Sequence, residues 1–523
     1  MRSRLYLPHY IAILVLAGCA EASDIPTDAI APKALSLATA YTNVVQVSTV
    51  DQLRAAVRNA VPGTSITVAA GIYDLGNQGI KIEEKNGLDI SGAGIGRTVI
   101  KTGRRAAYGF ELVGRVANLS VSHLSIEGAY PADTNTHALA GGSYRMSLNG
   151  ARYFDLDIRN VAVGISVLNS SVGGCTNVQI TGNYLTNIQD FVKPDGTTPG
   201  SGYGIHNDGC TATRIADNVI RDADRHSIYQ AGGYQQPGPG SVVIEHNLII
   251  DHAKTSSLNS TWLVAISVAR SSNVVVANNV IVNPYHDALS IETAGPYVVN
   301  NVRLINNTVL GGRDMDIFLE AGGTYTMSGN RFFHRDATNF TTSPTVRRWG
   351  AGVSGSLVEP APYVGTKALA SSAPFTTMFA MVGTVLGKGT PVYNTDPATW
   401  PMTANVAVRW TQFEDMAANG GIAYVANGRK LTEVNGATWA LRTASWTLPG
   451  QTMLGYGDNG LIALSGGRFG KIDPASLNPT TYAVPGSGTI NGMALFGGYA
   501  YLMRGNCFYQ VSTASFSSTL LGC

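Results

Sequence analysis

Charged residues are scarce in this sequence. Asp, Glu, Lys and Arg make up 13% of the 523 residues, which is about half the share usual in soluble proteins. Long charged surface helices are therefore not expected. The 36 Lys and Arg residues nearly balance the 34 Asp and Glu residues, and the formal net charge is only +2. The strongly basic surface of a nucleic-acid-binding protein is excluded, so no nucleic-acid partner is expected.

Long apolar runs and metal-binding cysteine motifs are also missing. No run of about 18 or more apolar residues follows the N-terminal segment, which excludes a protein with several membrane-spanning helices. None of the 5 cysteines stands in Cys-x-x-Cys spacing, and no His/Cys pair has the spacing of a structural zinc site. We therefore expect no metal site and no resident cofactor.

Glycine, by contrast, is abundant, with 60 residues. Together with an apolar content of 44%, it indicates a turn-rich, mostly β chain. The mean hydropathy of +0.06 excludes a largely disordered protein. The length indicates two or three domains.

The N-terminus has the pattern of an export signal. Arg2 and Arg4 precede the short apolar run of residues 11–16 and small residues. Residues 16–19 read Leu-Ala-Gly-Cys, which resembles the lipobox of bacterial lipoproteins and implies a lipid anchor at Cys19. Cleavage after residue 22 is the alternative. We assign residues 1–19 to the signal and 20–42 to a Pro/Ala/Ser tether, and expect a periplasmic, outer-membrane-anchored or secreted protein.

An asparagine recurs at intervals of about 29 residues along the middle of the chain. It follows a short strand of alternating apolar and polar residues and precedes another apolar strand, with steps of 35, 29, 32, 28 and 23 residues. Each repeat holds three short strands, and none could bury its apolar face alone. Stacked repeats form one core and pair parallel strands about 4.8 Å apart. The marker residues are Asn183, Asn218, Asn247, Asn279, Asn307 and Asn330.

Asparagine at a fixed corner tolerates the left-handed backbone of a turn, and its amide can bond to the asparagine of the next repeat. With this repeat the chain resembles the right-handed parallel β-helix of the pectate-lyase-like superfamily, which we assign to residues 43–350. Residues 49–52 read Thr-Val-Asp-Gln, a capping box that opens a helix with Leu53 and Val57 on one face. This helix is expected to cover the open end of the solenoid.

The cysteines of an exported chain are expected to form disulfides. Three pairings of the four remaining cysteines are open, but Cys175 and Cys210 each lie eight residues before a marker asparagine. They therefore occupy equivalent positions on adjacent rungs, which favours Cys175–Cys210 and leaves Cys507–Cys523 near the C-terminus.

A second strand family carries the chemistry. Its aliphatic residues are expected to point inward, so the residues that follow them, among them His206 and Tyr229, point outward and lie on neighbouring strands. Asp208 and Glu292 are outward by the same count, three residues after the aliphatic. Arg225 and His286 are outward as well, because each stands three residues before an inward aliphatic residue. The inward aliphatic residues are Ile165, Ile205, Ile228, Ile266, Leu289 and Ile317.

The same alternation makes predictions for other side chains. Tyr203 and Trp262 lie near the strand ends, where their rings could stack on sugars. His226 falls at an inward position and is expected to be structural. Asn207 and Gln230 also fall inward, so either they bond to each other inside the solenoid or the counted register slips there.

The resemblance implies a polysaccharide as partner, because members of this superfamily are mostly polysaccharide lyases, glycosidases or uronate C5-epimerases. Lyases and epimerases remove the proton at C5 of a uronic acid, whose carboxylate must be neutralised. We assign His206 as base, Tyr229 as acid and Arg225 as the carboxylate clamp, with calcium as the alternative clamp. Asp208, His286, Glu292, Trp262 and Tyr203 are expected to bind substrate.

Two other functions stay open. One is a non-catalytic carbohydrate-binding or adhesion protein of the cell surface that uses the same polar strip. The other is a glycoside hydrolase, whose inverting form needs two carboxyls about 6.5–9.5 Å apart. Asp208 and Glu292 are separated by two rungs in the predicted register, too far for such a pair. A monomer is expected in each case.

The asparagine repeat stops before the C-terminal region. We assign residues 351–375 to a linker and 376–523 to a smaller β domain. Four similar short strands begin near residues 378, 421, 460 and 498, a spacing of about forty residues. This spacing is typical of β-propeller blades, with a β-sandwich as the alternative. The predicted fold class is therefore all-β, a right-handed parallel β-helix followed by a propeller-like or sandwich domain.

Overall fold

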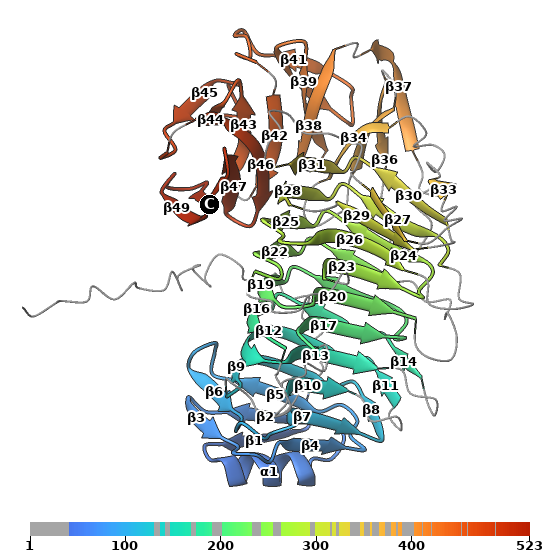
Figure 1. Cartoon of the computed structure of the whole chain (residues 1–523), viewed down its shortest axis with the longest axis vertical. Helices are drawn as coiled ribbons and strands as arrows, with labels where there is room; N and C mark the ends of the chain where they lie inside the picture. Colours follow the sequence, from blue (N-terminus) through green and yellow to red (C-terminus); the bar gives the residue numbers. More distant parts are fainter. Residues whose placement is uncertain are drawn as a thin grey trace, which may run out of the picture.

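The architecture was analysed in a computed structural model of the whole chain (Figure 1). Residues 1–40, with Cys19 and most of the tether, lie outside the part of the chain that the structure describes. The described residues are 41–129, 136–141, 147–168, 174–190, 201–232, 242–254, 263–292, 299–313, 316–320, 324–334, 346–349, 356–357, 366–371, 378–382, 385–389, 402–409, 412–419, 421–450, 452–457, 459–486 and 488–523.

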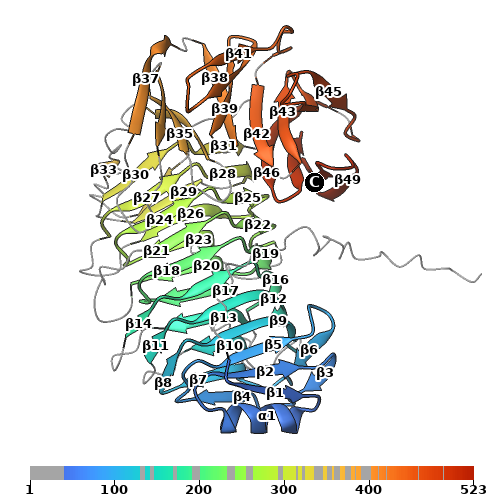
Figure 2. The same cartoon turned by 180° about the vertical axis from the view of Figure 1, so that it is seen from behind.

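The N-terminal two thirds of the chain form a solenoid with three faces of parallel strands, as the asparagine repeat predicts. The first face contains β4 (Ile80–Glu83), β7 (Tyr108–Val113), β10 (His137–Gly141), β13 (Val163–Leu168), β17 (Tyr203–Asp208), β20 (His226–Ala231), β23 (Val264–Ala269), β26 (Asp287–Glu292), β29 (Ile317–Glu320) and β32 (Val346–Trp349). Figure 2 shows these strands stacked one above another.

The second and third faces share two long strands that run through a corner. The second face contains β1 (Asn43–Val47), β2 (Thr64–Val68), β5 (Asp89–Gly92), β9 (Ser120–Glu127), β12 (Arg152–Val161), β15 (Gln179–Thr181), β18 (Thr213–Ala216), β21 (Val242–Glu245), β24 (Val274–Ala277), β27 (Val302–Ile305), β30 (Thr324–Ser328) and β33 (Ser356–Leu357). The third face contains β3 (Gly71–Asp74), β6 (Thr98–Lys101), parts of β9 and β12, β16 (Tyr184–Ile188), β19 (Val219–Ala223), β22 (Leu248–Ile250), β25 (Val280–Val282), β28 (Thr308–Gly312) and β31 (Arg331–His334). A short sheet at another corner contains β8 (Arg115–Ala117), β11 (Ser147–Asn149) and β14 (Cys175–Thr176).

The marker asparagines form the predicted ladder at the corner between the second and third faces. Asn247 shows the pattern: its Nδ2 donates to Asn279 Oδ1 at 2.9 Å, and its Oδ1 accepts from the backbone and side-chain nitrogens of Asn218 at 3.1 and 2.9 Å. The same bonds connect every successive pair from Asn183 to Asn330. Each buried amide is thereby satisfied by its neighbours.

One detail of the predicted corner is wrong. The left-handed residue is not the marker but the one before it, as at Asp217 (φ 59°), His246 (φ 52°) and Asn278 (φ 54°). A side chain at this position also bonds from rung to rung, because His246 Nδ1 lies 2.6 Å from Asp217 Oδ1. Two adjacent columns therefore stabilise the corner, one inside the solenoid and one at its surface.

The N-terminal end of the solenoid is covered by α1 (Val50–Asn59), visible at the end of the stack in Figure 1. Thr49 Oγ1 accepts the hydrogen of Gln52 N at 3.2 Å, and Gln52 Oε1 accepts the hydrogen of Ser48 N at 2.8 Å. Leu53 and Val57 are completely buried against the first rungs. The predicted helix, its cap and its role are confirmed.

In the described part of the C-terminal region, the strands form four antiparallel sheets of four strands each, and a propeller built from them stays a prediction. They are β34 (Thr366–Ser371), β35 (Met378–Val382), β36 (Val385–Gly389) and β37 (Met402–Arg409); β38 (Phe413–Asn419), β39 (Ile422–Asn427), β40 (Lys430–Asn435) and β41 (Leu441–Thr443); β42 (Thr452–Gly457), β43 (Gly460–Ser465), β44 (Arg468–Ile472) and β45 (Pro479–Tyr482); and β46 (Ile490–Phe496), β47 (Tyr499–Arg504), β48 (Cys507–Ser512) and β49 (Ser518–Gly522). The first sheet starts at β34, within the segment expected to be a linker.

The last two sheets pack on the third face of the later rungs, along β19, β22, β25, β28 and β31. Phe508, Phe496 and Leu310 share one buried apolar cluster, and the Phe496 ring stacks on His246 with centroids 4.8 Å apart. Arg331 Nη1 in β31 donates to Asp415 Oδ2 in β38 at 2.9 Å. Apolar packing and a partly buried ion pair therefore hold the two regions together.

Both predicted disulfides are present, Cys175–Cys210 and Cys507–Cys523. Disulfides of this kind are typical of proteins outside the cytoplasm. Within the described part of the chain, we find no helix with the length and apolar character needed to cross a membrane.

Candidate functional site

The outer surface of the first face carries the predicted imidazole–phenol pair. β17 and β20 pair in parallel with His206 opposite Tyr229, and the two ring centroids lie 5.2 Å apart. The strand alternation that placed both side chains outside the solenoid is therefore correct at these positions.

A bend in each strand adds two further rings to this pair. The parallel pairing skips one residue before the inward aliphatic on successive rungs, at Gly164, Gly204, Ser227, Ala265 and Ala288. At each skipped residue, the regular alternation between inward and outward side chains is interrupted. The side chain of the residue before it therefore lies on the outer side of the sheet, although a regular strand would point it inward.

The bend brings Tyr203 and His226 into contact with the pair. Tyr203 stacks on His206 at 4.9 Å, and His226 stacks on Tyr229 at 4.9 Å with 13° between the ring planes. The inward position expected for His226 counted a regular strand and is wrong, because this ring is part of the cluster, while its structural role stays a prediction. We call Tyr203, His206, His226 and Tyr229 the aromatic cluster.

The inward positions beneath the cluster hold a buried amide pair. Asn207 Nδ2 donates to Gln230 Oε1 at 2.6 Å, and Gln230 Nε2 donates to Ser271 Oγ at 3.1 Å. Asn207 Oδ1 also accepts the hydrogen of Cys210 N at 3.2 Å. The register does not slip there, and the amides connect the two central strands to the Cys175–Cys210 disulfide.

Two guanidinium groups flank the aromatic cluster. Arg225, just before β20, places its Cζ 5.4 Å from the Tyr203 ring centroid. Arg270, just after β23, hydrogen-bonds to the Tyr229 side chain. The positive charges of both arginines act on His206 and on Glu292.

The surroundings determine which groups carry protons. Burial and the positive charges of Arg225 and Arg270 lower the pKa of His206 to about 4, so its ring is neutral at neutral pH. Burial is also the main reason why the pKa of Tyr229 is raised, which keeps the phenol protonated. His206 Nε2 is buried without a hydrogen-bond partner among the described residues, although the side chain as a whole is only partly buried.

His226 is held in one tautomer. Its Nδ1 lies 3.1 Å from the backbone oxygen of Val264, which can only accept, so Nδ1 carries the proton and Nε2 the lone pair. Burial and the nearby Arg225 charge lower the pKa of His226 well below its usual value. The cluster thus combines the two neutral imidazoles of His206 and His226 with the protonated phenol of Tyr229.

Glu292, at the end of β26, belongs to the same neighbourhood. Ser267 Oγ donates to its Oε1 at 2.8 Å and Ser290 Oγ at 2.5 Å. Burial raises the pKa of Glu292, while the two hydroxyls and the Arg225 and Arg270 charges act in the opposite direction. Its carboxyl raises the pKa of Tyr229, which places it within electrostatic range of the phenol.

The other predicted site residues are less central. Asp208 is buried at the end of β17, and in its column Ala231 and Ala269 separate it from Glu292. Two intervening rungs put the two carboxyl positions about 14 Å apart, beyond the spacing for inverting hydrolysis. His286 acts on another imidazole of this part of the solenoid, because its charge lowers the pKa of His252. Trp262 lies outside the described residues.

Arg270 and His226 were not selected by the sequence reasoning. Arg270 lies four residues after Ile266 and so counts as inward, but its left-handed backbone (φ 52°) turns it away from the regular strand. The nearest sequence signal is that it directly follows a strand of the second family, one position beyond the place that Glu292 takes at the end of β26. Among the described residues, no group of three or more His, Cys, Asp or Glu side chains could hold a metal ion.

Comparisons with known proteins agree with the fold. Residues 145–332 match the family described as "Right handed beta helix region". No curated protein matches the chain. Similar solved structures include an alginate lyase from Paenibacillus sp. str. FPU-7, with 16% identity over 60% of this chain and 97% of that chain and a TM-score of 0.42.

Two further structures are similar over about the same share of the chain. They are the catalytic domain of GH87 alpha-1,3-glucanase in complex with nigerose (14% identity, 61% of this chain, 68% of that chain, TM-score 0.35) and a DFA-IIIase from Arthrobacter chlorophenolicus A6 in complex with DFA-III (15%, 59%, 80%, 0.36). The strand register, the asparagine ladder and the family match agree, and the chain is a right-handed parallel β-helix protein.

Proposed function

We propose that this protein is an exported enzyme that acts on a uronate-containing polysaccharide by β-elimination or C5-epimerisation at the aromatic cluster. One observation carries the proposal: the neutral His206 imidazole and the protonated Tyr229 phenol lie side by side, and two guanidinium groups, Arg225 and Arg270, are close enough for their charges to act on His206. This is the set of groups that removal of a proton next to a carboxylate needs.

The arginines would bind the sugar carboxylate. Arg225 and Arg270 both act on His206, and a carboxylate bound between them would spread the negative charge that develops when the C5 proton leaves. Neutralising the two positive charges would also raise the pKa of His206 and make it a stronger base in the complex. Substrate binding and base strength are therefore coupled.

His206 would take the C5 proton on Nε2, the buried nitrogen that has no other partner among the described residues. In β-elimination the C4–O bond then breaks, its electron pair goes to the leaving oxygen, and the Tyr229 hydroxyl protonates that oxygen. The products are a 4,5-unsaturated sugar and a new chain end, and solvent returns the proton to Tyr229 from His206. In epimerisation Tyr229 would instead protonate the opposite face of C5.

A panel of uronate polymers tests the proposal. Near-ultraviolet absorbance from an unsaturated sugar indicates a lyase, and a changed C5 configuration without chain cleavage, read by proton NMR, indicates an epimerase. His206→Ala and Tyr229→Phe should each lower turnover at least about 100-fold while leaving the circular dichroism spectrum unchanged.

Tyr108→Phe is the matched control. Tyr108 in β7 and His137 in β10 form a similar phenol–imidazole pair on the same face, with ring centroids 5.6 Å apart. Tyr108 lies three rungs and His137 two rungs from β17. This variant should retain activity. Full activity of both His206→Ala and Tyr229→Phe would refute the site, reducing ends without absorbance would indicate a hydrolase, and retention without product would indicate the carbohydrate-binding alternative.

Anchoring is a separate part of the proposal. Cys19 would carry the lipid that holds the mature chain to a membrane, with the polysaccharide as its partner in the surrounding medium. Labelling of the expressed protein with a radioactive fatty acid, lost in Cys19→Ser, would support this anchor.

A further inference from the structure

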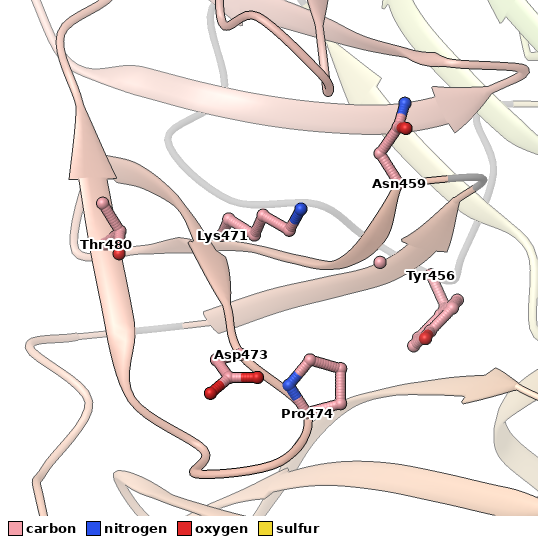
Figure 3. A pocket seen from close by; sticks show the side chains of 7 residues that line it. Tyr456, Asn459, Lys471, Asp473, Pro474 and Thr480 are labelled. Carbon is pink, nitrogen blue, oxygen red and sulfur yellow. The ribbon is translucent and has the colours of Figure 1, made fainter.

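A hollow of about 410 Å³ lies on the third C-terminal sheet, on the side of β42, β44 and β45. Figure 3 shows Tyr456, Asn459, Lys471, Asp473 and Thr480 around it. The volume falls in the range of small-molecule sites and would hold one or two sugar rings. The hollow belongs to the C-terminal region and shares no residue with the aromatic cluster.

One wall of the hollow is a fixed aromatic ring. Tyr456 stacks on Tyr424 of the preceding sheet, with ring centroids 5.8 Å apart and 17° between the planes. Tyr424 is buried, so Tyr456 rests on the core and its ring cannot easily turn away. A rigid ring with a polar tip is well suited to stacking on a sugar while bonding to a hydroxyl.

The charged groups of the hollow differ in how they are used. Asp473 is held in its own turn, where its carboxylate accepts hydrogens from Ser476 Oγ at 2.6 Å and Ala475 N at 3.0 Å. These bonds lower the pKa of Asp473. Lys471, in contrast, has no carboxylate within ion-pair distance in the part of the chain that is described. The cation is thus available for a bound anion.

The turn that walls the hollow is held from the neighbouring sheet. Arg442 in β41 donates hydrogen bonds to the backbone oxygens of Pro474 and Ala475 and pairs with Glu433. Gly460 adds room on the other side, because at its φ of +114° a side chain would be strained and a Cβ would lie 3.4 Å from Lys471 Cε. The hollow is therefore preformed rather than shaped by the ligand.

We propose that this hollow is a second carbohydrate site, which binds a short acidic segment of a polysaccharide without acting on it. Tyr456 stacks on a sugar ring, Lys471 pairs with its carboxylate, and Asn459 and Thr480 bond to hydroxyls. The choice of a uronate rests on Lys471 and, in part, on the proposed function. The C-terminal region would then retain the polymer that the β-helix processes.

Calorimetric titration of the full chain tests this site. The probes are oligomers of galacturonate, mannuronate and guluronate, with cello-oligosaccharides as neutral controls, and a Tyr229→Phe background prevents turnover. We expect a two-site isotherm for at least one uronate oligomer. Tyr456→Ala and Lys471→Met should each weaken one of the two sites at least tenfold and leave the other unchanged.

A control variant and two opposing results distinguish failure of the second site from failure of the proposed function. Lys430→Met removes an exposed lysine of the second sheet and should leave both sites intact. The second site would be refuted by a one-site isotherm that is unchanged in both Tyr456→Ala and Lys471→Met. Equally strong binding of the neutral oligomers would refute the proposal that the ligand is acidic. A site lost only in Tyr456→Ala and Lys471→Met would support it even if no turnover is ever found.

Discussion

Removing one amide from the ladder should destabilise the rungs around it by several kcal/mol. In Asn247→Ala, the Asn218 backbone N–H and the Ile215 carbonyl each lose a partner, at 3.1 and 3.0 Å. Each buried group left without a hydrogen bond costs about 1–3 kcal/mol, so the loss is about 2–6 kcal/mol. Asn218 Nδ2 still donates to the Ile180 carbonyl, and Asn279 Oδ1 still accepts from the backbone nitrogen of residue 247. The effect is therefore limited to the Asn218 N–H and the Ile215 carbonyl.

Native-state hydrogen exchange is the suitable assay, because a solenoid need not unfold in a single step. Amides of β18, β21 and β24 should exchange about 30-fold to 10⁴-fold faster in Asn247→Ala, while those of β1 and β2 should not change. Asn149→Ala is the control, since Asn149 also accepts a bond from the next rung, at 3.0 Å from Asn177 Nδ2, but is exposed. Equal, small effects of both variants would refute the reasoning that the buried ladder stabilises the fold.

Three further predictions concern the site, the disulfide and the region interface. If His206 is the base, its unprotonated ring is the active form. The value of kcat/KM should therefore stay constant from neutral pH down to about pH 5 and fall only as the pH drops through the His206 pKa of about 4. A fall of kcat/KM centred near pH 6.5 would contradict this assignment. Replacing Cys175 and Cys210 by serine should lower the free energy of unfolding by about 2–4 kcal/mol and lower the melting temperature measured without reductant. An unchanged melting temperature would count against a structural disulfide. Asp415→Ala should leave the partly buried Arg331 without its carboxylate and speed amide exchange in β31 and β38. Asp415→Asn keeps an acceptor for Leu454 N and should have a smaller effect, and equal exchange rates in both variants would argue against the ion pair.

Most of the fold could be predicted from the periodic spacing of residues along the sequence. Each rung repeats the same path, so a residue such as Asn247 meets Asn218 and Asn279, and equal offsets from the markers identify Cys175 and Cys210 as partners. These contacts follow from the repeat alone, because stacking turns a sequence offset into a distance of one strand spacing.

The site was predicted less completely, because the alternation of inward and outward residues holds only within a regular strand. The pairing of His206 with Tyr229 lies in such a stretch and was predicted. His226 lies on the other side of the bend at Ser227, and a count by two gives it the wrong face.

The sequence by itself therefore determined the rung repeat, the ladder, the helix cap and both disulfides, all of which depend on spacing along the chain. Only the tertiary structure decided that Arg270 reaches Tyr229, that Arg225 lies over Tyr203, and that the last two C-terminal sheets pack on the later rungs. These contacts depend on strand bends, on turns with left-handed residues and on packing between distant segments, and no offset in the repeat encodes them.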